Sequence, residues 1–158
     1  MDEYKFDVEK ITAEIVLWIQ NWMAKNGNER TKVLIGVSGG KDSSATSALL
    51  VKALGKDRVI GVMMPNGEQK DISDSQTLVS HLGIKNYTVN IAKAYDGIQS
   101  AFTDAEIAKN IGKTGENEKQ QTNDSFSSVF KTNTPARLRM VTLYGIAGQI
   151  GNCRVVNT

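Results

Sequence analysis

The chain has 158 residues, of which 40% are hydrophobic and 23% are charged, and its formal net charge is +2. These values suit a soluble globular domain with its own core, and so small a charge does not support nucleic-acid binding. One cysteine, Cys153, excludes an internal disulfide and a Cys-x-x-Cys centre in this chain. No apolar run approaches the ~18 residues of a membrane span, and the N-terminus is acidic and polar, unlike a signal peptide. We therefore expect a cytoplasmic protein without a membrane or nucleic-acid partner.

The spacing of apolar residues predicts helices and strands that alternate along the chain. The predicted helices cover residues 8–25, 44–54, 71–82, 94–111 and a last segment that runs to about Gln149. Asn133 or Thr134 is expected to cap this last helix, with Pro135 in its first turn. The predicted strands cover residues 32–37, 59–64, 87–91 and a segment that begins at Val155. This alternation predicts a three-layer α/β fold, in which a parallel sheet carries helices on both faces.

We assign no chemistry to three further features of the chain. Residues 112–128 are polar and poor in apolar side chains, and we interpret them as a mobile loop. Trp18 and Trp22 lie at helical spacing, so we expect them in the core or in subunit packing. His81, the only histidine, lies near a predicted helix end and is assigned a surface or packing role without chemistry.

A glycine-rich run between the first predicted strand and the next helix is the main candidate for a binding site. Its eight residues are Gly36, Val37, Ser38, Gly39, Gly40, Lys41, Asp42 and Ser43. In this context, backbone N–H groups and the positive end of the helix dipole converge on one point, which favours a phosphate. Gly39 and Gly40 allow close approach of the phosphate, because they have no Cβ atom. Asp42 would repel a phosphate unless Mg²⁺ lies between them, so it is the candidate metal ligand.

The run is not a Walker A loop. That motif requires Gly, four residues and then Gly-Lys-Ser/Thr, whereas here Asp42 follows Lys41 and Ile35 stands at the position of the first glycine. Ligands of parallel α/β sheets lie at the carboxyl ends of the strands. Four segments are therefore expected to meet at one rim, and they are residues 38–43, 64–70, 91–95 and 157–158.

Together, the motifs of this chain resemble one enzyme family. Ser-Gly-Gly-Lys-Asp-Ser at residues 38–43 resembles the pyrophosphate loop of enzymes that cleave ATP between its α- and β-phosphates. With Asn-Thr-Pro-Ala-Arg-Leu-Arg-Met at residues 133–140, it is similar to the ammonia-dependent NAD⁺ synthetases of the N-type ATP pyrophosphatase superfamily. The turn at residues 64–69 and the segment at residues 155–158 are similar to the same family, so the resemblance spans nearly the whole chain.

The resemblance implies an adenine nucleotide alpha-hydrolase-like fold, a homodimer and a reaction. ATP would activate the nicotinate carboxylate of deamido-NAD⁺ as an adenylate, and ammonia would then displace AMP to give NAD⁺, with pyrophosphate as the other product. The glycine-rich run would hold the pyrophosphate, and Asp42 would bind Mg²⁺. Gln69 and Thr158 would contact ATP. The residues implied for deamido-NAD⁺ are Phe130, which would stack on an aromatic ring, Asn133 and Arg137.

The two neighbouring arginines receive different interpretations. Residues two apart on a helix point in roughly opposite directions, so Arg137 and Arg139 cannot both face one pocket unless they lie in the first turn. We prefer Arg137 for the substrate and interpret Arg139 as solvent-facing or as part of an intersubunit ion pair.

The resemblance also sets expectations about the extent of the chain. The family continues past Thr158 to a glutamate that is a second magnesium ligand and to further substrate-binding residues, so we expect a single domain cut after its fourth strand. Whether this chain is active alone stays open. No glutaminase sequence precedes the first helix here, so free ammonia is the expected nitrogen source, unless another protein delivers it.

Two alternatives stay open at this point. One is another ATP pyrophosphatase, such as a tRNA-modifying enzyme or an amidotransferase synthetase. A net charge of +2 is small for a protein that binds tRNA, and the segment at residues 133–140 has no evident purpose in such enzymes. The other is a non-catalytic module that binds adenine nucleotides. Asp42 separates this module from an enzyme, because a pure binder has little need of a carboxylate beside a phosphate.

Overall fold

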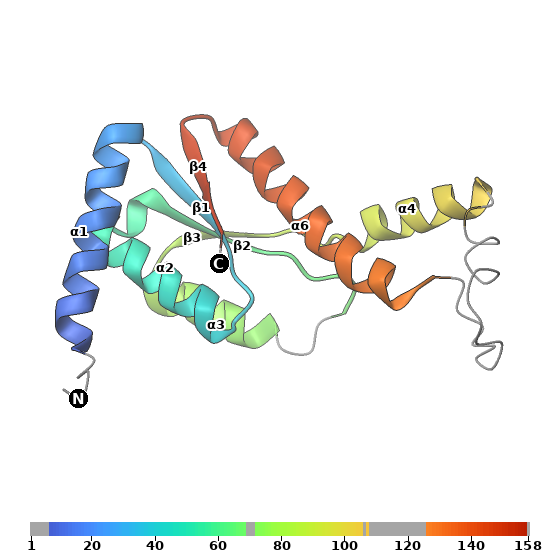
Figure 1. The fold of residues 1–158 in the computed structure, drawn as a ribbon, viewed down its shortest axis with the longest axis horizontal. Coiled ribbons are helices and arrows are strands. Elements are labelled where there is room, and N and C mark those ends of the chain that lie inside the picture. Colours follow the sequence, from blue (N-terminus) through green and yellow to red (C-terminus); the bar gives the residue numbers. More distant parts are fainter. Residues whose placement is uncertain (1–6, 69–71, 106, 108–125, 158) are drawn as a thin grey trace, which may run out of the picture.

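The computed structural model describes residues 7–68, 72–105, 107 and 126–157 of the chain (Figure 1). The described helices are α1 (Val8–Asn26), α2 (Lys41–Leu54), α3 (Ile72–Leu82), α4 (Ala92–Asp104) and α6 (Ser128–Ile150), and a short 3-10 turn spans Lys56–Arg58. The described strands are β1 (Lys32–Gly36), β2 (Val59–Met63), β3 (Lys85–Thr88) and β4 (Cys153–Val156). The predicted alternation of strand and helix is confirmed. None of these helices is long and apolar enough to cross a membrane.

The four described strands form one parallel sheet in the order β3-β2-β1-β4. The chain moves outward from β1 through β2 to β3, and then returns through α6 to place β4 on the other side of β1 (Figure 1). The strand order therefore reverses between β1 and β4. In open α/β sheets, the crevice outside the carboxyl ends of the strands at such a reversal is where ligands bind.

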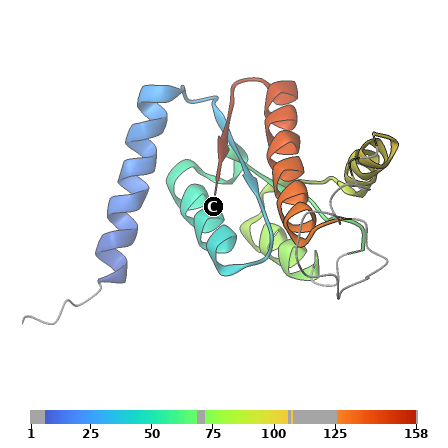
Figure 2. The same ribbon diagram turned by 45° about the vertical axis from the view of Figure 1, so that its right-hand side comes forward.

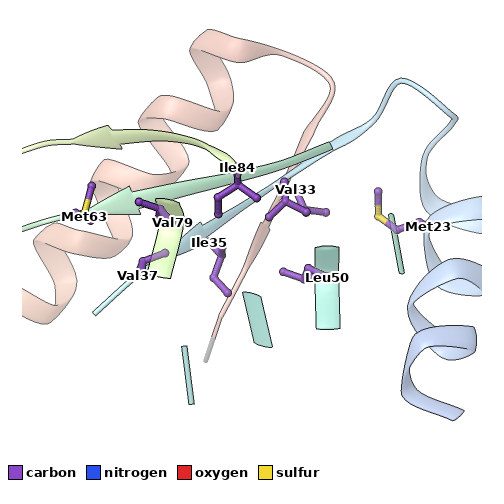
Figure 3. Packing of buried hydrophobic residues seen from close by; sticks show 9 residues of the cluster. Met23, Val33, Ile35, Val37, Leu50, Met63, Val79 and Ile84 are labelled. Atoms are coloured by element: carbon purple, nitrogen blue, oxygen red, sulfur yellow. The ribbon is translucent and has the colours of Figure 1, made fainter. Parts of the chain in front are cut away.

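Helices cover both faces of the sheet, as predicted. Val33 and Ile35 of β1 belong to a core cluster that also holds residues of α1, α2 and α3 (Figure 3). Leu34, between them, belongs to a second cluster with Leu143 of α6 on the opposite face. Successive side chains of a strand point to opposite faces, so a strand that is covered on both sides needs an unbroken apolar run. The run at Val33–Ile35 meets that need, and each of its three side chains is at most 1% exposed.

The first helix packs at the outer edge of the domain (Figure 2). Met23 is its one buried side chain, whereas Trp18 is 64% exposed and Trp22 is 40% exposed. The expectation that the tryptophans lie in the core is therefore wrong for the described residues, while their place in subunit packing stays a prediction. Helical spacing identified the apolar side of the helix, but the face that meets α2 covers only part of that side.

Several segment boundaries differ from the prediction; the fourth strand, for example, begins at Cys153 and not at Val155. The third strand is Lys85–Thr88 and not residues 87–91. Its alignment with β2 nevertheless continues, because the N–H groups of Val89 and Ile91 donate to the carbonyls of Met63 and Pro65 at 2.9 and 2.8 Å. The regular part of α4 ends at Asp104. Ala105 and Ile107 are described, whereas residues 106 and 108–111 of the predicted helix and residues 112–125 of the predicted loop lie outside the described residues. The predicted loop is wrong at its end, because Ser127 caps α6 and Ser128 is the first residue of that helix.

The start of the last helix is a larger correction. The helix begins at Ser128, and the Ser127 hydroxyl caps it by accepting a hydrogen bond from the Phe130 N–H at 3.2 Å. Pro135 is thus inside the helix and buried, not in its first turn. A proline in the first turn is a frequent signal of a helix start. It is a weaker signal than a serine cap, because the serine oxygen accepts a hydrogen bond from an N–H group that has no partner within the helix. His81 is exposed near the end of α3, in agreement with a surface role.

Candidate active site

The glycine-rich turn joins the end of β1 to the start of α2. Its first part is tied to the sheet, because the Val37 N–H donates to the Val62 carbonyl at 2.8 Å. Gly40 is the N-cap of α2, which begins at Lys41 and not at Ser44 as the sequence predicted. Lys41, Asp42 and Ser43 therefore form the first helical turn. Their N–H groups have no partner within the helix, so the turn has the backbone chemistry of an anion site.

Serine hydroxyls hold the turn in shape. Ser43 is buried, and its Oγ lies 3.0 Å from the Ser38 Oγ and donates to the Gly40 carbonyl at 3.1 Å. The Ser38 N–H donates to the same Ser43 oxygen at 3.3 Å, and the Ser44 hydroxyl donates to the Gly40 carbonyl at 2.8 Å. The buried hydroxyl of Ser43 thus stabilises the turn through hydrogen bonds within the protein, and the backbone N–H groups are the ones available to bind a ligand.

The turn also packs closely against the start of α3. Gly39 has a φ of +77°, and a Cβ atom there would lie 2.9 Å from the Asp74 Cβ and 3.1 Å from the Ser75 N. Ser75 is buried, and its hydroxyl donates to the Val37 carbonyl at 3.4 Å. Gly39 is required both for the backbone angle and for this contact. Ser75 also helps to fix the position of the turn, although a serine in a helix offers no sequence signal for such a role.

Asp42 and Lys41 are exposed in the first turn of α2. Among the described residues, no group of three His, Cys, Asp or Glu side chains is close enough to hold a metal by itself. A magnesium ion is normally held by one or two carboxylates, phosphate oxygens of the substrate and water. Asp42, an exposed carboxylate beside the anion-binding turn, fits that mode of binding.

A pocket of about 630 Å³ lies at the carboxyl ends of β1, β2 and β4, beneath α6. This volume is within the range of small-molecule sites. The lining residues are Gly36, Val37, Ser38, Met63, Met64, Ile72, Ser75, Ala136, Arg139, Met140, Leu143, Val156 and Asn157. Three of the four predicted rim segments contribute to this pocket, and residues 91–95 do not.

The structure corrects the interpretation of the two arginines. Arg139 is half-buried, lines the pocket, and donates from Nε to the Met64 carbonyl at 3.0 Å. Arg137 is exposed, lies outside the lining and donates to the Asn133 carbonyl of its own helix at 3.2 Å. The two side chains do diverge, as predicted, but it is Arg139 that faces this pocket and not solvent. Without the true helix start, the sequence could not tell which arginine faces inward.

Phe130 belongs to an aromatic cluster between α4 and α6. Its ring stacks on Phe126 at a centroid distance of 4.7 Å and contacts Phe102 and Tyr95 at 5.4 and 5.8 Å. Asn133 is exposed one turn later. Neither residue lines the pocket. The structure therefore separates the predicted substrate residues from the pocket beside the glycine-rich turn, while Gln69 and Thr158 lie outside the described residues.

The fold and the site define a class of protein. A parallel sheet with an anion-binding turn at the first strand–helix junction, beside a pocket at the reversal of strand order, is typical of nucleotide-binding α/β domains. A family model described as NAD synthase matches residues 11–158. The chain belongs to the NAD synthase family.

Curated relatives agree with this assignment. The NH(3)-dependent NAD(+) synthetase of Pyrococcus furiosus is 33% identical over 147 residues, which cover 93% of this chain and 47% of the relative. The enzyme of the same description from Methanosarcina acetivorans is 35% identical over 155 residues, which cover 96% and 52%. The chain thus spans about half the length of these relatives.

Solved structures show the same fold. An NH3-dependent NAD synthetase from Campylobacter jejuni matches with a TM-score of 0.73 and 24% identity, over 96% of this chain and 56% of that one. An NMN synthetase from Francisella tularensis matches with a TM-score of 0.69 and 28% identity, over 92% and 52%.

Proposed function

We propose that this chain provides the nucleotide-binding part of an ammonia-dependent NAD⁺ synthetase. The reaction uses ATP to adenylate the nicotinate carboxylate of deamido-NAD⁺ and ammonia to displace AMP, with NAD⁺ and pyrophosphate as products. The observation that carries the proposal is the glycine-rich turn, which places the first turn of α2 beside the pocket at the strand-order reversal. The N–H groups of a first helical turn have no partner within the helix. Membership of the NAD synthase family supports the particular reaction.

The turn would stabilise the leaving pyrophosphate. Negative charge grows on the β-phosphate as the bond to the α-phosphate breaks, and fixed N–H dipoles aimed at that position lower the barrier. The hydroxyl bonds of Ser43 and the packing of Gly39 against α3 fix the turn beforehand. Asp42 would hold Mg²⁺ together with phosphate oxygens, and the ion, when bound, neutralises the phosphate charge. Gln69 and Thr158 are proposed as further contacts to ATP.

The dinucleotide is proposed to bind beside the pocket, along the first half of α6. Arg137 has an exposed guanidinium that suits a phosphate or carboxylate. Asn133, one turn before it, is also exposed. Phe130 is proposed to stack on an aromatic ring of the substrate, and its half-buried position within an aromatic cluster supports a rigid platform.

The homodimer and the cytoplasmic location belong to the same proposal. Exposed apolar side chains support association with another copy; they are Trp18 on α1, which is 64% exposed, and Val141 and Tyr144 on α6, which are 68% and 59% exposed. A single nucleotide-binding domain is proposed for the whole chain.

Product analysis by mass spectrometry tests the function. The chain is mixed with ATP, Mg²⁺, ammonium and deamido-NAD⁺, and NAD⁺ and AMP are expected together only when all four components are present. ATP cleavage that does not require deamido-NAD⁺ would favour another ATP pyrophosphatase. A parallel reaction with nicotinate mononucleotide is needed, because one similar structure is an NMN synthetase. Binding of ATP without turnover would place the remaining catalytic groups outside these 158 residues.

A further inference from the structure

One face of α6 forms a wall of the pocket. The lining residues from this helix are Ala136, Arg139, Met140 and Leu143. They occur at positions i, i+3, i+4 and i+7, which is the spacing of one helical face. Arg139 therefore faces the pocket because of the phase of the whole helix. The side chain is also held in place, since its Nε donates to the Met64 carbonyl at 3.0 Å.

Arg139 is the one charged side chain among the described residues that line the pocket. Its hydrogen-bond partner there is a neutral carbonyl, and neighbouring walls are apolar at Ile72 and Leu143. A positive charge without a lining carboxylate to offset it, beside apolar side chains, attracts an anion more strongly than the same charge would in water. A guanidinium that uses Nε for the protein retains the N–H groups of its other two nitrogens for a ligand.

We propose that Arg139 binds the phosphate next to the nucleoside, which is the α-phosphate of ATP and the phosphate of AMP. This inference rests on the proposed function. The N–H groups at the start of α2 are the site for the terminal phosphates, and residues 39–43 do not line the pocket. Residues 36–38, which lead into the turn, do line it. A nucleotide with its terminal phosphates at the turn extends its nucleoside end into the pocket, so its α-phosphate passes the Arg139 wall.

Calorimetric titration with AMP, ATP and inorganic pyrophosphate tests the assignment in the chain and in Arg139→Gln. AMP and ATP are expected to bind about tenfold to a hundredfold more weakly to the variant, because a charge-assisted hydrogen bond is lost. Pyrophosphate is expected to bind within about twofold of the unaltered chain, since the turn is unchanged. Arg139→Lys keeps the charge without the planar fork, so it is expected to recover part of the AMP affinity. Arg30→Gln is the matched control, because it makes the same substitution at an exposed residue outside the pocket lining.

The outcomes separate the possible roles of Arg139. If it only ties α6 to the turn after β2, Arg139→Gln weakens AMP and pyrophosphate equally, and this result overturns the proposal. Unchanged AMP affinity in Arg139→Gln, or in Arg139→Lys if the first variant does not fold, overturns it as well. If the unaltered chain binds neither AMP nor ATP, the proposed function fails together with it. Binding of AMP by the unaltered chain with no effect at Arg139 refutes the arginine assignment alone.

Discussion

Replacing Gly39 by alanine is the sharpest test of the turn. Gly39 has a φ of +77°, and an added Cβ would lie 2.9 Å from the Asp74 Cβ and 3.1 Å from the Ser75 N at the start of α3. The positive φ costs an L side chain about 1–3 kcal/mol. Overpacking against another helix adds about 1–3 kcal/mol, because the backbone at Ser75 must move. The free energy of unfolding should therefore fall by roughly 2–6 kcal/mol, a large part of the ~5–15 kcal/mol of an ordinary domain.

Two other glycines separate these contributions. Gly55 has a φ of +82° with nothing within 4 Å of an added Cβ, so Gly55→Ala should show the backbone cost alone, about 1–3 kcal/mol. Gly40 has a φ of −72°, and the nearest atom to its added Cβ is the Ser38 Oγ at 3.3 Å. Gly40→Ala should cost less than about 1 kcal/mol, because the Ser38 oxygen needs to move only slightly and can keep its hydrogen bond to Ser43.

Urea unfolding followed by far-UV circular dichroism measures all three variants, provided that the slope of free energy against urea stays constant. Inorganic pyrophosphate titration of the folded variants is the second assay, and Gly39→Ala is expected to bind it most weakly, since the displaced turn misdirects its N–H groups. Equal destabilisation by Gly39→Ala and Gly55→Ala would refute the packing of the turn against α3. A fully stable Gly39→Ala would refute the positive φ itself.

Four further predictions concern single residues. Asp42→Asn should abolish the Mg²⁺ dependence of ATP affinity in paired titrations with and without the metal, whereas metal-independent binding by the unaltered chain would favour a non-catalytic module. Arg137→Ala should weaken deamido-NAD⁺ binding about tenfold and spare ATP; equal loss of both ligands would indicate a folding defect. Thr31 is 0% exposed, accepts from the Asn28 N–H at 2.8 Å and donates to the Asn152 Oδ1 at 2.8 Å. Thr31→Val should therefore lower the free energy of urea unfolding by about 1–3 kcal/mol, and no change would show that water replaces these bonds. Burial raises the pKa of the Cys153 thiol, so less of the reactive thiolate is present at a given pH. Iodoacetamide should therefore react with Cys153 more slowly at pH 8 in the folded chain than in the urea-unfolded chain. Equal rates would contradict the raised pKa.

The sequence by itself determined the elements and the class of site. Apolar spacing is a local property, so it identified the alternation of strands and helices, and with it the parallel sheet that carries helices on both faces. The sequence also identified the run at residues 36–43 as a phosphate-binding turn, because the conformational freedom of Gly39 and the strand–helix context are both defined within a few residues. The distinctive segment at residues 133–140 indicated the family that the comparisons then showed.

Only the tertiary structure decided which side chains meet. The cap at Ser127 moved the start of α6, and the packing of Leu143 against the sheet set the phase that turns Arg139 into the pocket and Arg137 away from it. Trp18 looks like a core residue by spacing, yet it is mostly exposed, because α1 packs at the edge of the domain. A change of one residue in helix phase rotates every side chain by about 100°. Sequence periodicity specifies that a helix has two sides, but contacts between distant segments decide which side is covered and by what.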